Sequence, residues 1–179
     1  DELRPNIQNI ISYFKENQVD IKIISGDQAE TVSFLARLAK VSDSDKCVDL
    51  STNNISYDEL VEENTVFGRV LPKQKKELIE ALQRKGHVVA MIGDGVNDVP
   101  SLKEADVSLS LEDATYAAKN IANIVLLSND FGMIPSIVNE GRRVINNISR
   151  GATMFLVKTG FSLFISIYVI MFHEHYPFI

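Results

Sequence analysis

The segment HVVAMIGDGVNDVPSLKEADVSLSL (residues 87–111) indicates the fold class of this chain. It opens on a continuous apolar run at 87–93, which is typical of a strand covered on both faces. A turn rich in glycine and acidic residues follows, and a second strand-like run comes at 106–111. Such strands, in a chain where strands and helices alternate, predict a parallel sheet with flanking helices in an α/β fold.

The rest of the chain up to residue 127 keeps the same alternation. We expect strands at 19–25, 65–70 and 123–127, and helices ending at Leu38, spanning 72–86, and around 114–119. Pro72 suits the first turn of its helix, and Gly86 suits its end. Ser56 followed by Glu59 resembles a capping box that opens a short helix. The segment 41–64 fits this alternation least well, and we expect it to be an insertion.

An apolar segment, residues 151–172, follows the α/β part and has Lys158 as its only charge. As a helix it would cover roughly 33 Å, enough for a bilayer core of about 30 Å. Arg142, Arg143 and Arg150 precede it, and Tyr176 lies past its other end, as expected for a span that starts in the cytoplasm. A buried core helix or an interfacial segment is the alternative. Residues 131–150 have helical spacing and predict a stalk helix continuous with the span.

Composition excludes several classes of protein. The 179 residues are 45% hydrophobic and 23% charged, which is ordinary for a globular chain and excludes wholesale disorder. The single cysteine cannot form an internal disulfide. The net charge of −6 disfavours a general nucleic-acid binder, so no nucleic-acid partner is expected.

Three polar clusters follow or adjoin the predicted strands, where ligands of parallel sheets bind. The first is Ser25-Gly26-Asp27, in which a hydroxyl and backbone N–H groups can approach an anion. The second places Lys73 and Lys75 at a helix start. Taken alone, the first also fits a capped turn and the second a solvated helix face.

The third cluster, Ile92-Gly93-Asp94-Gly95-Val96-Asn97-Asp98, is the most specific. Two carboxylates four residues apart beside a strand end can gather a hard cation such as Mg²⁺. An Asp-Gly turn whose acids cap the next helix is the alternative. The length of the cluster, directly after an apolar strand, favours the metal site.

These residues resemble the P-type cation-transporting ATPases. MIGDGVNDVPSLKEADVSLSL (91–111) is similar to the hinge signature of that family, and Ser25-Gly26-Asp27 to its TGD turn. The family's DxxRP and P-x-x-K segments correspond to residues 1–5 and 72–75, and its stalk to Gly141-Arg142-Arg143 and Asn146-Asn147. The resemblance implies a Rossmann-like phosphorylation domain of the haloacid dehalogenase type, continued into a long stalk and a transmembrane helix, the family's fifth.

The resemblance also implies roles for single residues. It implies ATP as the substrate and Mg²⁺ as the cofactor. The implied catalytic set is Ser25, Lys75, Asp94, Asn97 and Asp98. Phosphate would be bound by Ser25, Gly26, Asp27, Lys75 and Asn97, and the metal by Asp94 and Asp98, with Asp98 orienting either Lys75 or the metal shell.

One departure limits what the chain does alone. The DKTGT motif that carries the family's phosphorylated aspartate does not occur, and the chain starts at Asp1. We therefore expect a fragment without turnover of its own: residues 1–130 as the second half of the phosphorylation domain, 131–150 as stalk, 151–172 as span and 173–179 as a loop. Its partners would be membrane lipid, the transported cation, the nucleophile-bearing half and the nucleotide-binding and actuator domains. The whole protein would be a multi-pass protein of the cell membrane, with residues 1–150 cytoplasmic.

Two other function classes remain open at this point. A phosphatase of the haloacid dehalogenase superfamily would need its own nucleophile and no span, and a membrane-anchored binding module would not bind phosphate or Mg²⁺. For a pump, a divalent cation is expected, calcium before magnesium or manganese. Lys158, Thr159 and Ser162 are candidates for the ion path. His173-Glu174-His175 is interpreted as a solvated loop rather than a metal site.

Overall fold

The computed structural model describes residues 6–51, 56–127 and 129–172. It divides the chain into two compact units, Asp1–Met133 and Ile134–Ile179. The segment at residues 1–5 that resembles DxxRP, Tyr176 and the His173-Glu174-His175 loop lie outside the described residues.

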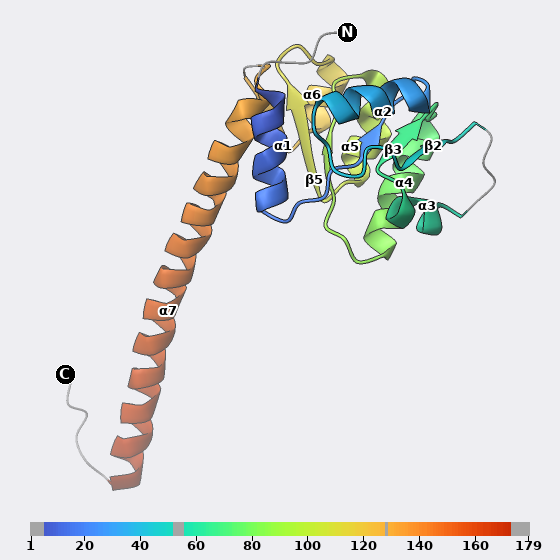
Figure 1. Cartoon of the computed structure of the whole chain (residues 1–179). Helices are drawn as coiled ribbons and strands as arrows, with labels where there is room; N and C mark the ends of the chain where they lie inside the picture. The colour runs from blue at the N-terminus through green and yellow to red at the C-terminus, as the bar shows by residue number, and fades with distance from the viewer. Residues whose placement is uncertain (1–5, 52–55, 128, 173–179) are drawn as a thin grey trace. The chain divides into compact units, whose positions relative to one another are not determined.

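The first unit contains a three-stranded parallel sheet built from the early strands. Its order is β1 (Ile23–Ile24), β3 (Val66–Gly68) and β2 (Cys47–Asp49), with Val66 aligned to both Ile23 and Cys47. The helices α1 (Ile7–Glu16), α2 (Ala29–Leu38), α3 (Tyr57–Glu63) and α4 (Pro72–Arg84) belong to the same half of the unit. Figure 1 shows these helices around the short strands.

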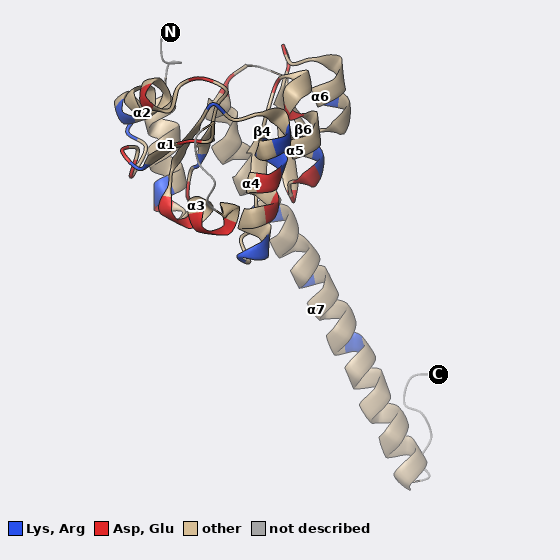
Figure 2. Ribbon diagram, turned by 90° about the vertical axis from the view of Figure 1, so that its right-hand side faces the viewer, with Lys and Arg blue, Asp and Glu red and all other residues tan. Residues whose placement is uncertain are grey.

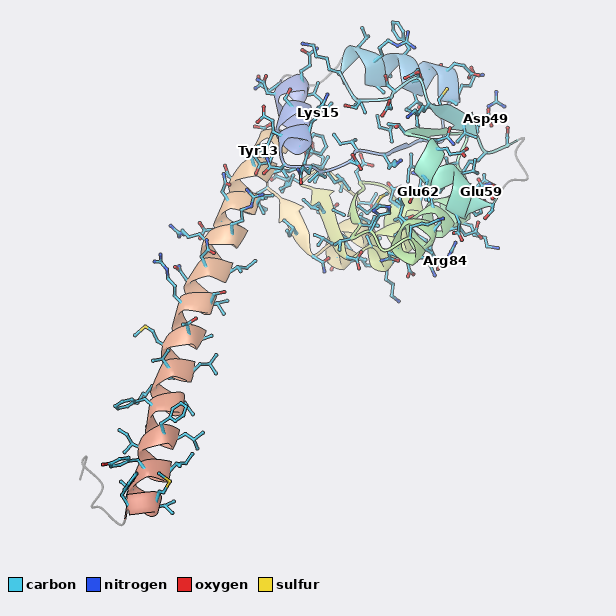
Figure 3. The ribbon with its side chains drawn as sticks, turned by 60° about the horizontal axis from the view of Figure 1, so that its bottom comes forward. Tyr13, Lys15, Asp49, Glu59, Glu62 and Arg84 are labelled. Carbon is cyan, nitrogen blue, oxygen red and sulfur yellow. The ribbon has the colours of Figure 1, made fainter. Side chains whose placement is uncertain are left out.

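The core of this half forms because apolar side chains of β3 and α4 meet. Phe67 and Leu78 are both about 1% exposed and lie in one cluster with Val61 of α3. On the surface, Arg84 of α4 donates to Asp58 of α3 (Nη2–Oδ1 2.6 Å), and Figure 3 labels Arg84 together with Glu62 of α3. α4 starts at Pro72 and stops before Gly86, whose φ of 90° suits glycine, so the predicted helix ends are confirmed.

A second three-stranded parallel sheet follows, in the order β4 (Ala90–Ile92), β5 (Val107–Leu111) and β6 (Ile124–Leu126). Leu109 pairs with Ile92 on one side and with Ile124 on the other. The helices η1 (Val96–Asp98), α5 (Val99–Glu104) and α6 (Tyr116–Ile121) connect these strands. η2 (Phe131–Met133) ends the unit. The predicted parallel sheet with flanking helices is confirmed, as two sheets rather than one.

Three local predictions are wrong. Segment 41–64 is no insertion, because β2 extends the first sheet and the buried Val48, Leu60 and Val61 belong to its core. α3 does follow Ser56, but the Ser56 side chain makes no capping bond, and its backbone carbonyl accepts from the Glu59 N–H instead (3.1 Å).

The third error concerns β4, which we expected to be covered on both faces. Ala90 and Ile92 are exposed, and Val88 just before them is 84% exposed. The physical reason is that β4 is an edge strand, paired only with β5 among the described residues. An apolar run shows that a strand can be buried but not whether a neighbour covers it.

The second unit consists of α7 (Ile134–Phe172), a single helix of 39 residues. It contains the apolar segment 151–172, and within the described residues it is the one helix long and apolar enough to cross a membrane. Figure 2 shows few coloured charged residues along it. The predicted stalk and span thus form one uninterrupted helix from Ile134 onward, whereas the first three residues of the predicted stalk form η2.

Candidate functional site

The predicted site residues of the first unit lie at the carboxyl ends of β1 and β4 and at the start of α4. Ser25, Gly26 and Asp27 directly follow β1, and Gly93 to Asp98 directly follow β4. Lys75 lies in the first turns of α4, the helix that leads from β3 to β4. Carboxyl ends of parallel strands are where α/β proteins bind ligands, so both loops are in a suitable place.

Hydrogen bonds hold the loop after β1. The Ser25 hydroxyl accepts from the Asp27 N–H (3.1 Å) and donates to the Asp27 carboxylate (3.3 Å). The backbone of Ser25 donates to Phe67 and accepts from Val70, at 2.9 and 3.0 Å, so β3 and the residues after it fix the loop. Gly26 is exposed, and nothing lies within 4 Å of the place where its side chain would begin. The Gly26 backbone is therefore accessible to a ligand.

An ion pair connects α4 with the second loop. Lys75 Nζ lies 2.7 Å from Asp98 Oδ1, although the two residues are 23 positions apart, and their side chains are only 15% and 10% exposed. Lys73 differs, because its side chain is 89% exposed and faces Glu77 at 3.7 Å. Of the two lysines, Lys75 is the one aimed at the candidate site.

The second loop is packed so tightly that one glycine in it is obligatory. A Cβ atom at Gly93 would come within 2.7 Å of the Asp98 Cβ atom. The second oxygen of Asp98, Oδ2, accepts from the Gly95 N–H (3.2 Å). Asp98 is thus buried, paired through one oxygen with Lys75 and through the other with its own loop.

The two acids of this loop differ in what they could offer a metal ion. Both Asp98 oxygens already have partners, whereas Asp94 is exposed and no described side chain pairs with its carboxylate. Among the described residues, no three acidic, histidine or cysteine side chains gather to hold a metal on their own. Mg²⁺ commonly takes one or two carboxylates, water and phosphate oxygens, and a single free carboxylate fits that pattern. Asn97 is also exposed on this loop.

Two charged residues at the same edge of the first sheet were missed by the sequence reasoning. Arg69 follows β3 in a left-handed conformation (φ 51°), and its Nε lies 3.2 Å from Asp49 Oδ2 at the end of β2. The pKa of the Asp49 carboxyl is lowered, first by hydrogen bonds from Ser51 and further by the Arg69 charge. The arginine near the end of the predicted strand 65–70 was the available signal.

The candidate ion-path residues lie on α7, in the second unit. Lys158, Thr159 and Ser162 are exposed on this helix, and the Ser162 carbonyl accepts a bond from the Ser166 hydroxyl (2.9 Å). All three residues belong to the apolar segment 151–172 of α7.

Comparison with known proteins agrees with this geometry. A family model described as haloacid dehalogenase-like hydrolase matches residues 1–106, which include both loops and Lys75. The chain belongs to the haloacid dehalogenase-like hydrolases. Membership agrees with the position of the two candidate loops, which follow the carboxyl ends of β1 and β4, where α/β proteins bind ligands.

The curated relatives of this haloacid dehalogenase-like chain are cation-transporting ATPases, which confirms the resemblance found in the sequence. It is 44% identical over 93% of its length to "Probable cation-transporting ATPase exp7" of Streptococcus pneumoniae, covering 22% of that protein. It is 42% identical over 93% of its length to a calcium-transporting ATPase of Mycolicibacterium smegmatis, covering 21% of it. The chain therefore spans about a fifth of the length of these relatives.

The fold has a solved counterpart as well. The crystal structure of a zinc-transporting PIB-type ATPase in its E2.Pi state matches 94% of this chain and 24% of its own, with a TM-score of 0.76 and 21% identity. At 21% identity this similarity is evidence for the fold alone, and it extends over most of the chain.

Proposed function

We propose that this chain is part of an ATP-driven cation pump whose phosphorylation domain forms and hydrolyses an aspartyl phosphate. The observation that carries the proposal is the buried Lys75–Asp98 pair beside the exposed Asp94 carboxylate, after β4. Phosphoryl transfer is catalysed mainly by positioning and charge neutralisation. This arrangement offers a fixed cation, Lys75, bound to the same loop that carries a carboxylate available to a metal, Asp94. The relatives that bear cation-transporting names support the same conclusion.

Each residue has a distinct task in this proposal. An ammonium group has three N–H donors, so Lys75 keeps two for phosphate oxygens while Asp98 holds the third. The Gly26 N–H and the Asn97 amide donate to the same phosphate, and the Ser25 hydroxyl does so when its one proton turns from the Asp27 carboxylate to the phosphate. The Asp27 N–H, which donates to the Ser25 hydroxyl oxygen, still holds the loop. Mg²⁺, held by Asp94, would neutralise charge on the phosphate and on the attacking carboxylate.

The nucleophile would come from the part of the protein that carries the DKTGT motif. Among the described residues, β1 pairs only with β3 and β4 only with β5, and all these pairs are parallel. Each sheet thus presents one free parallel edge next to one of the two ligand loops. A parallel strand added at these edges would bring a residue at its carboxyl end to Ser25 and Asp94, and would pair with the free backbone edge of β4.

The membrane part of the proposal rests on α7 and on the relatives. We infer a multi-pass protein of the cell membrane with residues 1–150 in the cytoplasm, because three arginines precede the apolar segment. Calcium is the preferred cation, since one relative is named a calcium-transporting ATPase. Lys158 would act as a counter-charge beside the ion site, with Thr159 and Ser162 supplying oxygens, because charges within a span usually face the protein interior.

The test is phosphoenzyme formation from ATP in the full-length protein. Asp94→Asn should fold normally, since the side chain is exposed, but should lower Mg²⁺-dependent phosphoenzyme by at least about tenfold. Asp45→Asn, an exposed aspartate before β2, is the matched control. Normal phosphoenzyme in Asp94→Asn would contradict the metal role, and a wild-type protein that forms none would contradict the pump.

The same preparation tests the ion path. Lys158→Met and Thr159→Ala should still be phosphorylated but should require a higher cation concentration for stimulation. Wild-type ion affinity in both variants would remove this face of α7 from the path.

A further inference from the structure

The buried strand β5 holds the loop that contains Asp94. The Ser110 side chain is fully buried, and its hydroxyl donates to the backbone carbonyl of Gly93 at 3.0 Å. Five residues later, the Thr115 N–H donates to the backbone carbonyl of Asp94 at 2.9 Å. Both donors come from the segment that includes β5 and the start of α6, far from the loop in sequence.

These two bonds restrain the backbone on both sides of Asp94 and so the point from which its side chain extends. The Gly93 carbonyl belongs to the peptide group before Asp94, and the Asp94 carbonyl to the one after it. Holding both peptide groups sets φ and ψ of Asp94, and φ and ψ determine where its Cα–Cβ bond points. The following group is held at its other end too, because the Gly95 N–H donates to Asp98. The peptide group before Asp94 is held by the Ser110 hydroxyl. A substitution of the Ser110 side chain removes this bond, whereas the bond from the Thr115 N–H comes from the backbone.

We propose that Ser110 is a positioning residue that aims the Asp94 carboxylate at the metal ion, through its hydrogen bond to the Gly93 carbonyl. The inference rests on the proposed function, because it takes Asp94 to be the Mg²⁺ ligand. A carboxylate on a loop loses affinity when it samples many directions, and groups that orient metal ligands typically contribute 10–100-fold to affinity. Ser110 acts through the backbone and not by contact with the metal.

Two buried serines provide matched controls. Ser108 lies on the same strand and face, is 1% exposed, and bonds to Asn123 (Oγ–Oδ1 3.0 Å) rather than to the loop. Ser101 is fully buried, and its hydroxyl has no hydrogen-bond partner among the residues that the structure describes. Replacing Ser108 removes two bonds elsewhere, because its hydroxyl also accepts from the Asn123 N–H (3.1 Å), and replacing Ser101 removes only a buried oxygen.

The experiment measures the binding of Mn²⁺, which serves as a probe for Mg²⁺, to the full-length protein. Binding is followed by the decrease in the electron paramagnetic resonance signal of free Mn²⁺. Ser110→Ala should raise the Kd for Mn²⁺ about tenfold, while the maximal phosphoenzyme at saturating metal stays within about twofold of wild type. Ser108→Ala and Ser101→Ala should leave the Kd unchanged, Ser110→Thr should restore it, and Asp94→Asn should abolish the site. If Ser110→Ala does not fold, Ser110→Cys, whose thiol is a weak donor, carries the same expectation.

The outcomes separate this inference from the proposed function. A Kd within about twofold of wild type in Ser110→Ala, or an equal rise in Ser108→Ala, would overturn the positioning role. A wild-type protein that binds no Mn²⁺ at Asp94 would overturn it as well. A protein that binds Mn²⁺ at Asp94 but forms no phosphoenzyme would contradict the pump, and the Mn²⁺ titrations would still decide the role of Ser110.

Discussion

At the scale of single residues, the environment of a lysine decides what it can do. Lys73 and Lys75 are two positions apart on α4, and a helix turns about 200° over that distance, so they face opposite ways. Lys73 is in solvent beside Glu77, and Lys75 is nearly buried against Asp98. A surface pair contributes little to stability, whereas removing one partner of a buried pair leaves an uncompensated charge.

We therefore predict that replacing Lys75 impairs the protein and that replacing Lys73 does not. Lys75→Met should destabilise the protein, by on the order of 3 kcal/mol, and abolish phosphoenzyme formation, because Asp98 loses its partner and the phosphate loses its cation. Adding Asp98→Asn should recover most of the stability but none of the phosphoenzyme. Lys73→Met should change neither. Thermal unfolding of the full-length protein measures stability, and phosphorylation from ATP measures phosphoenzyme formation. Similar effects of the two lysine substitutions would contradict the assignment of Lys75 to the phosphate site.

At the scale of elements, an acid joins the beginnings of β4 and β5. The Asp106 carboxylate accepts from the Val89 N–H at 2.8 Å. This bond, and a weaker one from Gln83, lower the pKa of the Asp106 carboxyl. The unfolded chain therefore binds this proton at a higher pH than the folded one. The stabilisation is complete above the unfolded pKa, about 4, and is lost as pH falls through the folded pKa.

The pH dependence of unfolding tests this contact. The difference in Tm between wild type and Asp106→Asn should be largest above about pH 5 and should shrink as the pH falls below about 4. The amide in the variant does not titrate, so only the wild type loses this contribution in acid. Asp45→Asn serves as the control, because its exposed side chain lies outside the β4–β5 pairing. A Tm difference that stays constant from about pH 7 to about pH 3 would show that the Asp106 charge does not stabilise the fold.

At the scale of the whole molecule, α7 is longer than a bilayer requires. Its 39 residues cover about 58 Å, and a bilayer core is about 30 Å thick, so nearly half of the helix would lie outside it. A continuous helix transmits displacement along its axis because its backbone hydrogen bonds resist bending. In the proposed pump, α7 would connect the phosphorylation domain to the span.

Interrupting that helix should separate the two activities. Insertion of two or three glycines near Asn146 weakens the helix by about 1 kcal/mol per site. Phosphorylation from ATP should persist, and ion transport by the reconstituted protein should fall. An insertion of the same length with alanine, which keeps the helix, separates loss of rigidity from change of length. Unchanged transport in the glycine variant would argue against a rigid connection.

Local patterns in the sequence were enough to predict the order of most elements, the ends of α4, the apolar helix and the positions of the two candidate loops after β1 and β4. These follow from local causes: Pro72 and Gly86 act on their own turn, and an apolar run reports on its own strand. The DGVND loop was recognisable because its residues are contiguous. Nothing in these inferences required knowledge of which strands are neighbours.

The packing of the whole chain, by contrast, decided which distant residues meet. It paired Lys75 with Asp98, placed the Ser110 hydroxyl on the Gly93 carbonyl, left β4 exposed at an edge, and built β2 of segment 41–64 into the first sheet. Each of these depends on strand order and register. Side-chain patterns along one element record how much of it can be buried, but the partner is set by how all the elements pack at once.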